Sequence, residues 1–267
     1  HRAQKAEGNP NHPINKGALC ARGQASMQTL YNPSRIAHPL ADGKQIPWDE
    51  GMKQLSALIK VSSGAIAYLG KPASGSEGDF VDEWLNSAGG GKRYKFSLLT
   101  QKSQQEANKI SFGRPDIPDY AFENAGIVLN FSADFLEGWG NSVENARRFT
   151  ESHTYRNGNK SRLIHISPHI SLTGAKSDSW IVIKPGTEGL VALAIAFVIR
   201  EEKGNFEFLK KYLESYTPEK VAEATGVSAE KMRELAKDVM DHGPLLALAG
   251  GNLAATDQCV ETLTAVN

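Results

Sequence analysis

The chain has 267 residues and is 40% hydrophobic, which suffices for one large core or two smaller ones. Thirty basic residues balance thirty acidic ones, so the sequence lacks the positive field of a nucleic-acid-binding protein, and nucleic acid is set aside as a partner. No apolar run reaches the roughly 18 residues that a membrane-spanning helix needs, so we expect no direct membrane span.

The ends and the cysteines bear on what the chain can do alone. The first residue is His1 rather than Met and no export signal is visible, so we expect upstream sequence to be missing. The only cysteines are Cys20 and Cys259, far apart in sequence. They predict neither a disulfide framework nor a complete set of metal ligands within the chain.

The first third of the chain combines a loop-rich segment with the start of an α/β pattern. Residues 1–46 are rich in Gly, Pro and Asn and contain one short helical stretch near 24–31. From Trp48 onward, the apolar spacing and the turn residues predict helix and strand in alternation. The predicted elements are a helix over 48–60, a strand over 65–69, a helix around 80–85, a strand over 94–99 and a helix over 104–110.

The same alternation continues to the end of the chain. Strands are predicted over 126–131, 162–166, 180–183 and 245–249, with helices near 142–150, after 186, from Thr217-Pro218, from Ser228 and around Cys259. In the helix after 186, Thr187 is expected to be the N-cap and Glu188 to complement the positive helix end. Its predicted apolar face consists of Leu190, Leu193, Ala194, Phe197 and Val198.

This pattern predicts an α/β protein with Rossmann-like parallel sheets and flanking helices. We expect an entry segment over 1–46, a first α/β unit over 47–120 and a second, nucleotide-binding type of unit over 121–267. No Gly-x-Gly-x-x-Gly, Walker or Gly-x-Ser-x-Gly pattern occurs, so a plain nucleotide-binding protein and a hydrolase are weaker hypotheses.

Residues 7–23 (EGNPNHPINKGALCARG), followed by LYNPSR at 30–35 and Pro39-Leu40, resemble the molybdopterin oxidoreductase family, the dimethyl sulfoxide reductase superfamily. In that family this stretch closes an iron–sulfur domain, so 1–46 would be a remnant of it. The resemblance implies that Cys20 is the last ligand of a 4Fe–4S cluster whose other cysteines are missing from this chain. It also implies that Arg22 lies between the cluster and the pterin. On the residues alone, an ordinary small buried cysteine is the favoured interpretation of Cys20, and the resemblance makes the cluster ligand about equally favoured.

Three further segments follow the order of the family's nucleotide-binding loops. They are IVLNFSADFL at 127–136, IHISPH at 164–169 and KPGTE at 184–188. By resemblance, the cofactor-binding residues would be Ser132, Asp134, Ser167, Pro168, His169, Thr187 and Glu188. Loops after strands and before helices suit phosphate binding, because backbone N–H groups and helix dipoles point there.

Departures from the family pattern favour a lost cofactor. Ser167 stands where an acidic residue is usual, His169 where an arginine is common, and Glu188 where an aspartate is usual. Asp134 would carry negative charge toward phosphates; alternatively it is a solvated or capping carboxylate. The window Leu98 to Gln105, where catalytic members hold the molybdenum ligand, has no Cys and no acid; its Thr100 and Ser103 are more typical of helix caps. We therefore assign no catalytic residue.

The strings ADFLEGW at 133–139, SLTGAKSD at 171–178 and PGTEG at 185–189 are most similar to a narrower branch. It comprises the large iron–sulfur subunit of alternative complex III and of menaquinone reductases, in which the molybdopterin-like domain is retained without molybdenum. The resemblance implies an oxidoreductase-family subunit of a respiratory electron-transfer complex, of which this chain is a fragment that is not catalytically competent alone. It implies iron–sulfur and quinone-binding partner subunits and a periplasmic, membrane-associated location through those partners.

The alternative hypothesis is a part of an active molybdenum bis-guanine-dinucleotide enzyme that acts on an oxyanion or a sulfur compound. Under the first hypothesis, molybdopterin guanine dinucleotide has been lost and a 4Fe–4S cluster exists only in the full-length protein. Under the alternative, pterin and molybdenum are both bound.

Overall fold

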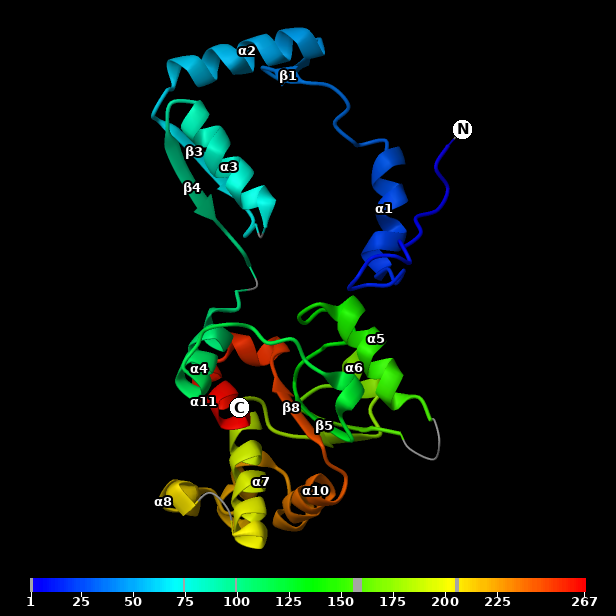
Figure 1. The fold of residues 1–267 in the computed structure, drawn as a ribbon, viewed down its shortest axis with the longest axis vertical. Coiled ribbons are helices and arrows are strands. Elements are labelled where there is room, and N and C mark those ends of the chain that lie inside the picture. Colours follow the sequence, from blue (N-terminus) through cyan, green and yellow to red (C-terminus); the bar gives the residue numbers. More distant parts are fainter. Residues whose placement is uncertain (1, 74, 99, 156–159, 205–206) are drawn as a thin grey trace. The chain divides into compact units, whose positions relative to one another are not determined.

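The computed structural model describes residues 2–73, 75–98, 100–155, 160–204 and 207–267. The chain forms two compact units (Figure 1). The larger unit comprises His1–Gln24 together with Gln101–Asn267, and the smaller unit comprises Ala25–Thr100. Among the described residues, no helix is long and apolar enough to cross a bilayer.

The smaller unit is built on a short parallel sheet with one helix against it. Its elements, together with the helix that leads into it, are α1 (Ala21–Tyr31), β1 (Leu40–Ala41), β2 (Lys44–Gln45), α2 (Trp48–Val61), β3 (Ile66–Gly70), α3 (Ser76–Ser87) and β4 (Gly91–Lys95). Strand β3 pairs with β4 in parallel, and α3 packs on β4 with Val81 and Leu85 buried. None of the α2 residues is buried.

The predicted strand over 94–99 is wrong in position. Strand β4 starts at Gly91 and ends at Lys95, where its partner β3 ends at Gly70; residues 96–98 are not strand, and Leu99 lies outside the described residues. A Cβ on Gly91 would lie 2.7 Å from the carbonyl oxygen of Ile66, so only glycine permits this pairing. The apolar residues after Lys95 are typical of a strand, but β4 ends at Lys95 because its pairing partner β3 ends at Gly70.

The larger unit contains a four-stranded parallel sheet. Its strands are β5 (Ile127–Phe131), β6 (Arg162–Ser167), β7 (Ser179–Val182) and β8 (Leu245–Ala249). Its helices are α4 (Lys102–Phe112), α5 (Ser142–His153), α6 (Leu172–Ala175), α7 (Glu188–Lys203), α8 (Lys210–Leu213), α9 (Pro218–Thr225), α10 (Ala229–Asp241) and α11 (Cys259–Val266). The strand order is β7-β6-β5-β8, so successive strands step one way from β5 to β7 and the chain then crosses to the other side of β5.

Two hydrophobic clusters cover the two faces of this sheet. Ile127, Leu129 and Phe131 of β5 join the larger cluster, with residues of α7, α9, α10 and α11. Val128 faces the other way and joins a second cluster with Phe149 of α5. Figure 1 shows α5 on one side of the sheet, and α7 and α10 on the other. Residues of β5 alternate between the two faces as a pleated strand requires, and all five are buried.

The predicted α/β class, with parallel sheets and flanking helices, is confirmed. One helix face differs from its prediction. The buried side chains of α7 include Val191, Ala194, Ile195 and Val198, whereas Leu190, Leu193 and Phe197 are only partly buried. Helix α7 contacts α9, α10 and α11, so it is covered on several sides and its apolar residues do not define one face.

Helix α4 belongs to the larger unit. It packs on α11 (Figure 1). Asn267 Nδ2 donates to Asn108 Oδ1 over 3.1 Å. The sequence division placed this helix in the first α/β unit, over 47–120. The division into 1–46, 47–120 and 121–267 stays a prediction.

Candidate functional site

The residues predicted to bind a nucleotide gather at one edge of the larger sheet. Strands β5, β6, β7 and β8 are parallel, so the loops that follow them all emerge at their carboxyl ends. Sheets of this kind bind ligands at that edge, most often where the strand order reverses. Here the reversal falls between β5 and β8.

The loop after β5 is held by hydrogen bonds within the chain. The amide of Ser132 donates to Ile166 O, that of Ala133 to Asn130 Oδ1, and that of Leu136 to Thr173 Oγ1. The amide of Phe135 donates to Ala133 O, and the amides of residues 137–139 all donate to the carbonyl oxygen of Asp134. Seven of the eight amides from residue 132 to residue 139 are thus engaged by the chain itself. A phosphate in this loop would have to compete with those bonds.

Ser132 and Glu188 meet in the interior of the edge. Ser132 is 1% exposed and has a left-handed backbone with φ of 59°; its hydroxyl donates to Glu188 Oε1 over 2.8 Å. Glu188 is 3% exposed, and its other oxygen, Oε2, is buried without a hydrogen-bond partner among the described residues. Oε1 of Glu188 therefore accepts a hydrogen bond from Ser132, whereas Oε2 is an acceptor without a donor in the described residues.

A second buried polar pair lies beside the loop. Asn130 and His165, on neighbouring strands, are both fully buried. The amide nitrogen Nδ2 of Asn130 lies 2.7 Å from Ala133 O and 2.8 Å from His165 Nδ1. Since the amide donates, Nδ1 accepts and the ring is neutral, with its proton on Nε2. Burial lowers the pKa of His165 to about 4, consistent with that neutral form. His165 is thus a neutral, hydrogen-bonded side chain in the packed interior of the sheet.

The loop after β6 holds Ser167, Pro168 and His169. The Ser167 hydroxyl donates to His169 O over 2.7 Å and accepts from Trp180 Nε1 over 3.0 Å. His169 is exposed, and its Nε2 lies 3.4 Å from the side-chain nitrogen of Asn252 in the turn after β8. Pro168 has no N–H to offer. The structure thus brings the loops after β6 and β8 together at His169.

The loop before α7 differs in detail from its prediction. Thr187 is the N-cap residue of α7, but its side chain makes no capping bond; the hydroxyl donates to Lys184 O over 2.6 Å.

Asp134, in the loop after β5, is half-buried, and its Oδ1 is without a hydrogen-bond partner in the described part of the chain. Its carbonyl, not its carboxylate, organises the loop. The sequence reasoning did not single out Gly250 and Gly251, although the Gly-Gly-Asn after a buried strand was visible.

The two predicted site residues of the N-terminal segment, Cys20 and Arg22, lie at the start of α1. Cys20 is exposed, which argues against an ordinary buried cysteine, and Arg22 is also exposed. A hydrogen bond with the Gly23 backbone lowers the pKa of the Cys20 thiol. Within the described residues, neither side chain makes a hydrogen bond or ion pair with the strand edge, and no three metal-binding side chains gather together.

Cys259 is buried, and it is the hydrogen-bond partner of one hydroxyl in the window where catalytic members hold the molybdenum ligand. Ser103 is hydrogen-bonded to the Cys259 thiol, whose pKa is raised by burial. Ser103 lies inside α4 and is therefore not its cap; the cap position is Gln101. Thr100 also has an interaction partner, and Leu99 lies outside the described residues.

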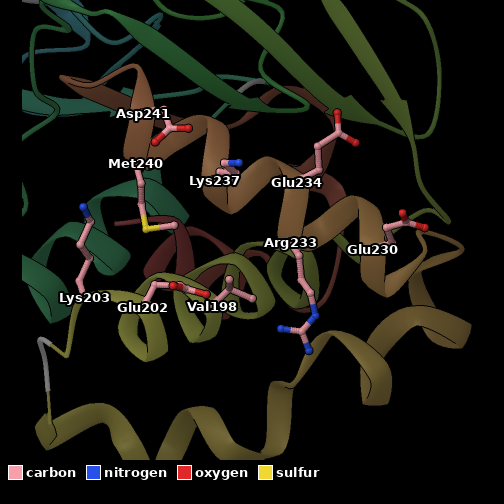
Figure 2. Close-up of a pocket in the computed structure, with 9 residues that line it drawn as sticks. All are labelled: Val198, Glu202, Lys203, Glu230, Arg233, Glu234, Lys237, Met240 and Asp241. Atoms are coloured by element: carbon pink, nitrogen blue, oxygen red, sulfur yellow. The ribbon is translucent and has the colours of Figure 1, made fainter.

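A separate groove of about 680 Å³ runs along α10 and the end of α7, and Figure 2 shows the side chains that line it. Its lining residues are Val198, Glu202, Lys203, Glu230, Arg233, Glu234, Lys237, Met240 and Asp241. Acidic and basic side chains alternate there, so the groove presents no single-sign charge for a ligand. It contains none of the predicted site residues.

Comparison with known proteins agrees with the resemblance seen in the sequence. Residues 1–32 match the model of the molybdopterin oxidoreductase Fe4S4 domain. The chain is 28% identical, over 92% of its length, to the menaquinone reductase molybdopterin-binding-like subunit of Nitratidesulfovibrio vulgaris, and it covers 37% of that protein. It is also 28% identical to a sulfite dehydrogenase subunit from Allochromatium vinosum, over 77% of this chain and 22% of that one.

The fold points the same way. Acetylene hydratase from Pelobacter acetylenicus superposes with a TM-score of 0.70 over 96% of this chain and 38% of the hydratase, at 17% sequence identity. The chain thus spans well under half the length of the relatives it matches. Sequence and fold together show that the chain is similar to members of the molybdopterin oxidoreductase family.

Proposed function

We propose that the chain is part of a subunit of a respiratory electron-transfer complex in which the molybdopterin fold is kept as a scaffold and its nucleotide site is vestigial. The observation that carries this proposal is the loop after β5, whose amides are engaged by the chain itself. A phosphate-binding loop needs free N–H groups directed at the anion. The residues at this edge therefore do not fit a bound guanine dinucleotide as they stand.

The other residues of the edge support the same proposal. The Glu188 carboxylate is held by Ser132, and the hydroxyl of Ser167 is turned to the carbonyl of His169. Of the predicted binding residues, only His169 brings an exposed titratable side chain to the edge, and its neighbour there is the neutral amide of Asn252. The relative from Nitratidesulfovibrio vulgaris carries the description "molybdopterin-binding-like".

In this proposal, electrons pass through iron–sulfur clusters of the full-length protein and of its partners. Cys20 would be one cluster ligand, with the remaining ligands supplied by cysteines outside this chain, and Arg22 would lie beside it. Iron–sulfur and quinone-binding subunits would be the partners, and the complex would attach the protein to the periplasmic side of a membrane.

A second candidate function is that of an active molybdenum bis-guanine-dinucleotide enzyme, acting on an oxyanion or a sulfur compound. One observation favours it: Oε2 of Glu188 is a buried acceptor without a partner in the described residues, and the N–H groups of a base could satisfy it. Binding would then require the loop after β5 to exchange its internal bonds for phosphate contacts.

Elemental and pterin analysis of the full-length native protein separates the two. Iron, molybdenum and the fluorescence of an oxidised pterin extract are measured together, with an active molybdoenzyme purified from the same cells as the control for molybdenum supply. The scaffold proposal expects iron without molybdenum or pterin. Molybdenum and guanine-dinucleotide pterin near stoichiometry would overturn it.

A further inference from the structure

Trp139 lies where the strand order of the larger sheet reverses. It lies in the loop between β5 and α5, and its indole packs against Gly250, directly after β8. A Cβ on Gly250 would lie 2.0 Å from the indole Nε1 and 2.5 Å from Cε2, so the ring rests on the glycine backbone. Ligands of such sheets bind in the crevice outside these strand ends. Here a ring of the chain itself lies at that place.

The neighbouring glycine is used in the same way. Gly251 has a φ of 66°, and a Cβ there would lie 2.2 Å from the carbonyl oxygen of Ser132. Glycines at this edge of nucleotide-binding folds give a ligand's phosphates room to approach the backbone. At Gly250 and Gly251 that room is filled by Trp139 and by the backbone of Ser132.

The indole of Trp139 also packs against Tyr120, which is itself held by Gln104 of α4. The ring of Tyr120 packs on Trp139 with centroids 5.2 Å apart, and the Tyr120 hydroxyl accepts from Gln104 Nε2 of α4 over 2.7 Å. Burial raises the pKa of Tyr120 to about 12, so it stays a neutral partner for Gln104. The backbone N–H of Trp139 donates to Asp134 O. These contacts tie the loop after β5 to the end of β8 and to α4.

We propose that Trp139 is a built-in plug of this crevice: its indole takes the position that a planar heterocycle would occupy and keeps the loop after β5 in its internally bonded form. The proposal deepens the vestigial-site function and rests on it. It assigns a cause to the loop geometry, since the indole packs against both Gly250 and Tyr120 and the loop that carries it is held with it.

The test replaces Trp139 with glycine in the full-length protein and follows amide hydrogen exchange. In W139G, exchange of the 132–139 peptide is expected to rise at least about tenfold, while the amides of β6 keep their wild-type rates. Added indole is expected to slow exchange in W139G and to leave the wild type unchanged. Unchanged exchange in W139G, or exchange that indole does not slow, would overturn the plug.

A second pair of variants covers the case in which W139G does not fold. In G250A the new Cβ has to displace the indole, so the same peptide should exchange faster; in G138A the Cβ meets nothing within 4 Å, so exchange should not change. Equal exchange in the two variants would contradict the proposal. Molybdenum and pterin in the wild type would remove the proposed function whatever W139G does, whereas a failed W139G test without pterin removes only the plug.

Discussion

Ser132 combines an unfavourable backbone with a favourable side-chain contact. A left-handed conformation costs a non-glycine residue roughly 1–2 kcal/mol, and Ser132 adopts it with φ of 59°. Its hydroxyl gives the buried Glu188 carboxylate a hydrogen bond, and bonds to charged groups contribute about 1.5–3 kcal/mol. The bond is thus large enough to offset the backbone cost.

Replacing Ser132 separates these two effects. S132A keeps the strained backbone and leaves Glu188 Oε1 without its donor, so the free energy of unfolding should fall by about 1–3 kcal/mol. S132G also loses the donor but relieves the backbone, so it should be the less damaged variant. Urea unfolding followed by tryptophan fluorescence measures both. If S132A matched the wild type, the Ser132–Glu188 bond would have no energetic role.

His165 predicts how stability depends on pH. Its folded-state pKa of about 4 is below the ordinary histidine value of 6.5, so the unfolded chain binds more protons between these values. Stability therefore falls as the pH is lowered from 6.5 toward 4, by about 1.4 kcal/mol per pKa unit, a total on the order of 3 kcal/mol. H165Q should flatten this part of the profile. H38Q, which changes an exposed histidine, should retain it; equal profiles for the wild type and H165Q would contradict the assignment.

At the scale of elements, the N-cap residues of α7, α9 and α10 differ in whether their side chains make a capping hydrogen bond. The side chains of Thr217 and Ser228 accept from the amides of Lys220 and Lys231, whereas Thr187 makes no capping bond. We expect S228A and T217A each to lower the free energy of unfolding by about 1 kcal/mol, and S228D to keep most of it, because aspartate also caps. Thermal unfolding of the variants gives the comparison. An S228D protein as destabilised as S228A would argue against a capping role.

Capping sequences and apolar strands could be predicted because they depend on neighbours along the chain. Strands β5, β6 and β8 fall within a residue of their predictions, since each is a short buried run bounded by turn residues. The position of β4 could not be predicted, because it depends on the carbonyl of Ile66 lying against Gly91. The pairing of Ser132 with Glu188 likewise joins residues 56 apart in sequence.

In the candidate site, too, the sequence predicts which loops come together but not the contacts that the loops make. Parallel strands guarantee that the loops after β5, β6 and β8 share an edge, so the sequence alone can gather Ser132, Ser167 and His169 there. It cannot tell whether the loop amides face outward or are bonded within the chain, because that depends on Asn130, Ile166 and Thr173. The plug contact between Trp139 and Gly250 is hidden for the same reason.

At the scale of the whole molecule, the chain covers less than half of its curated relatives, 37% of one and 22% of another. The proposed role in electron transfer depends on Cys20, which lies within the residues that match the Fe4S4 domain. Cys20 is exposed and its thiol pKa is lowered by the hydrogen bond with the Gly23 backbone, a shift that favours the thiolate, which is the form that ligates iron. Because one cysteine cannot hold a cluster, the consequence can be examined only in the full-length protein.

C20S in the full-length protein is therefore expected to lose iron and the visible absorption of the cluster, because a serine hydroxyl is a far poorer ligand for iron than a thiolate. C259S is the matched control: its thiol is buried, has a raised pKa and bonds to Ser103 in the interior, so iron content should stay at the wild-type level. Iron analysis and absorption spectra of both variants decide the matter. If C20S kept the iron content of the wild type, Cys20 would not be a cluster ligand. If both variants lost iron, the substitutions would have damaged the fold and not a ligand.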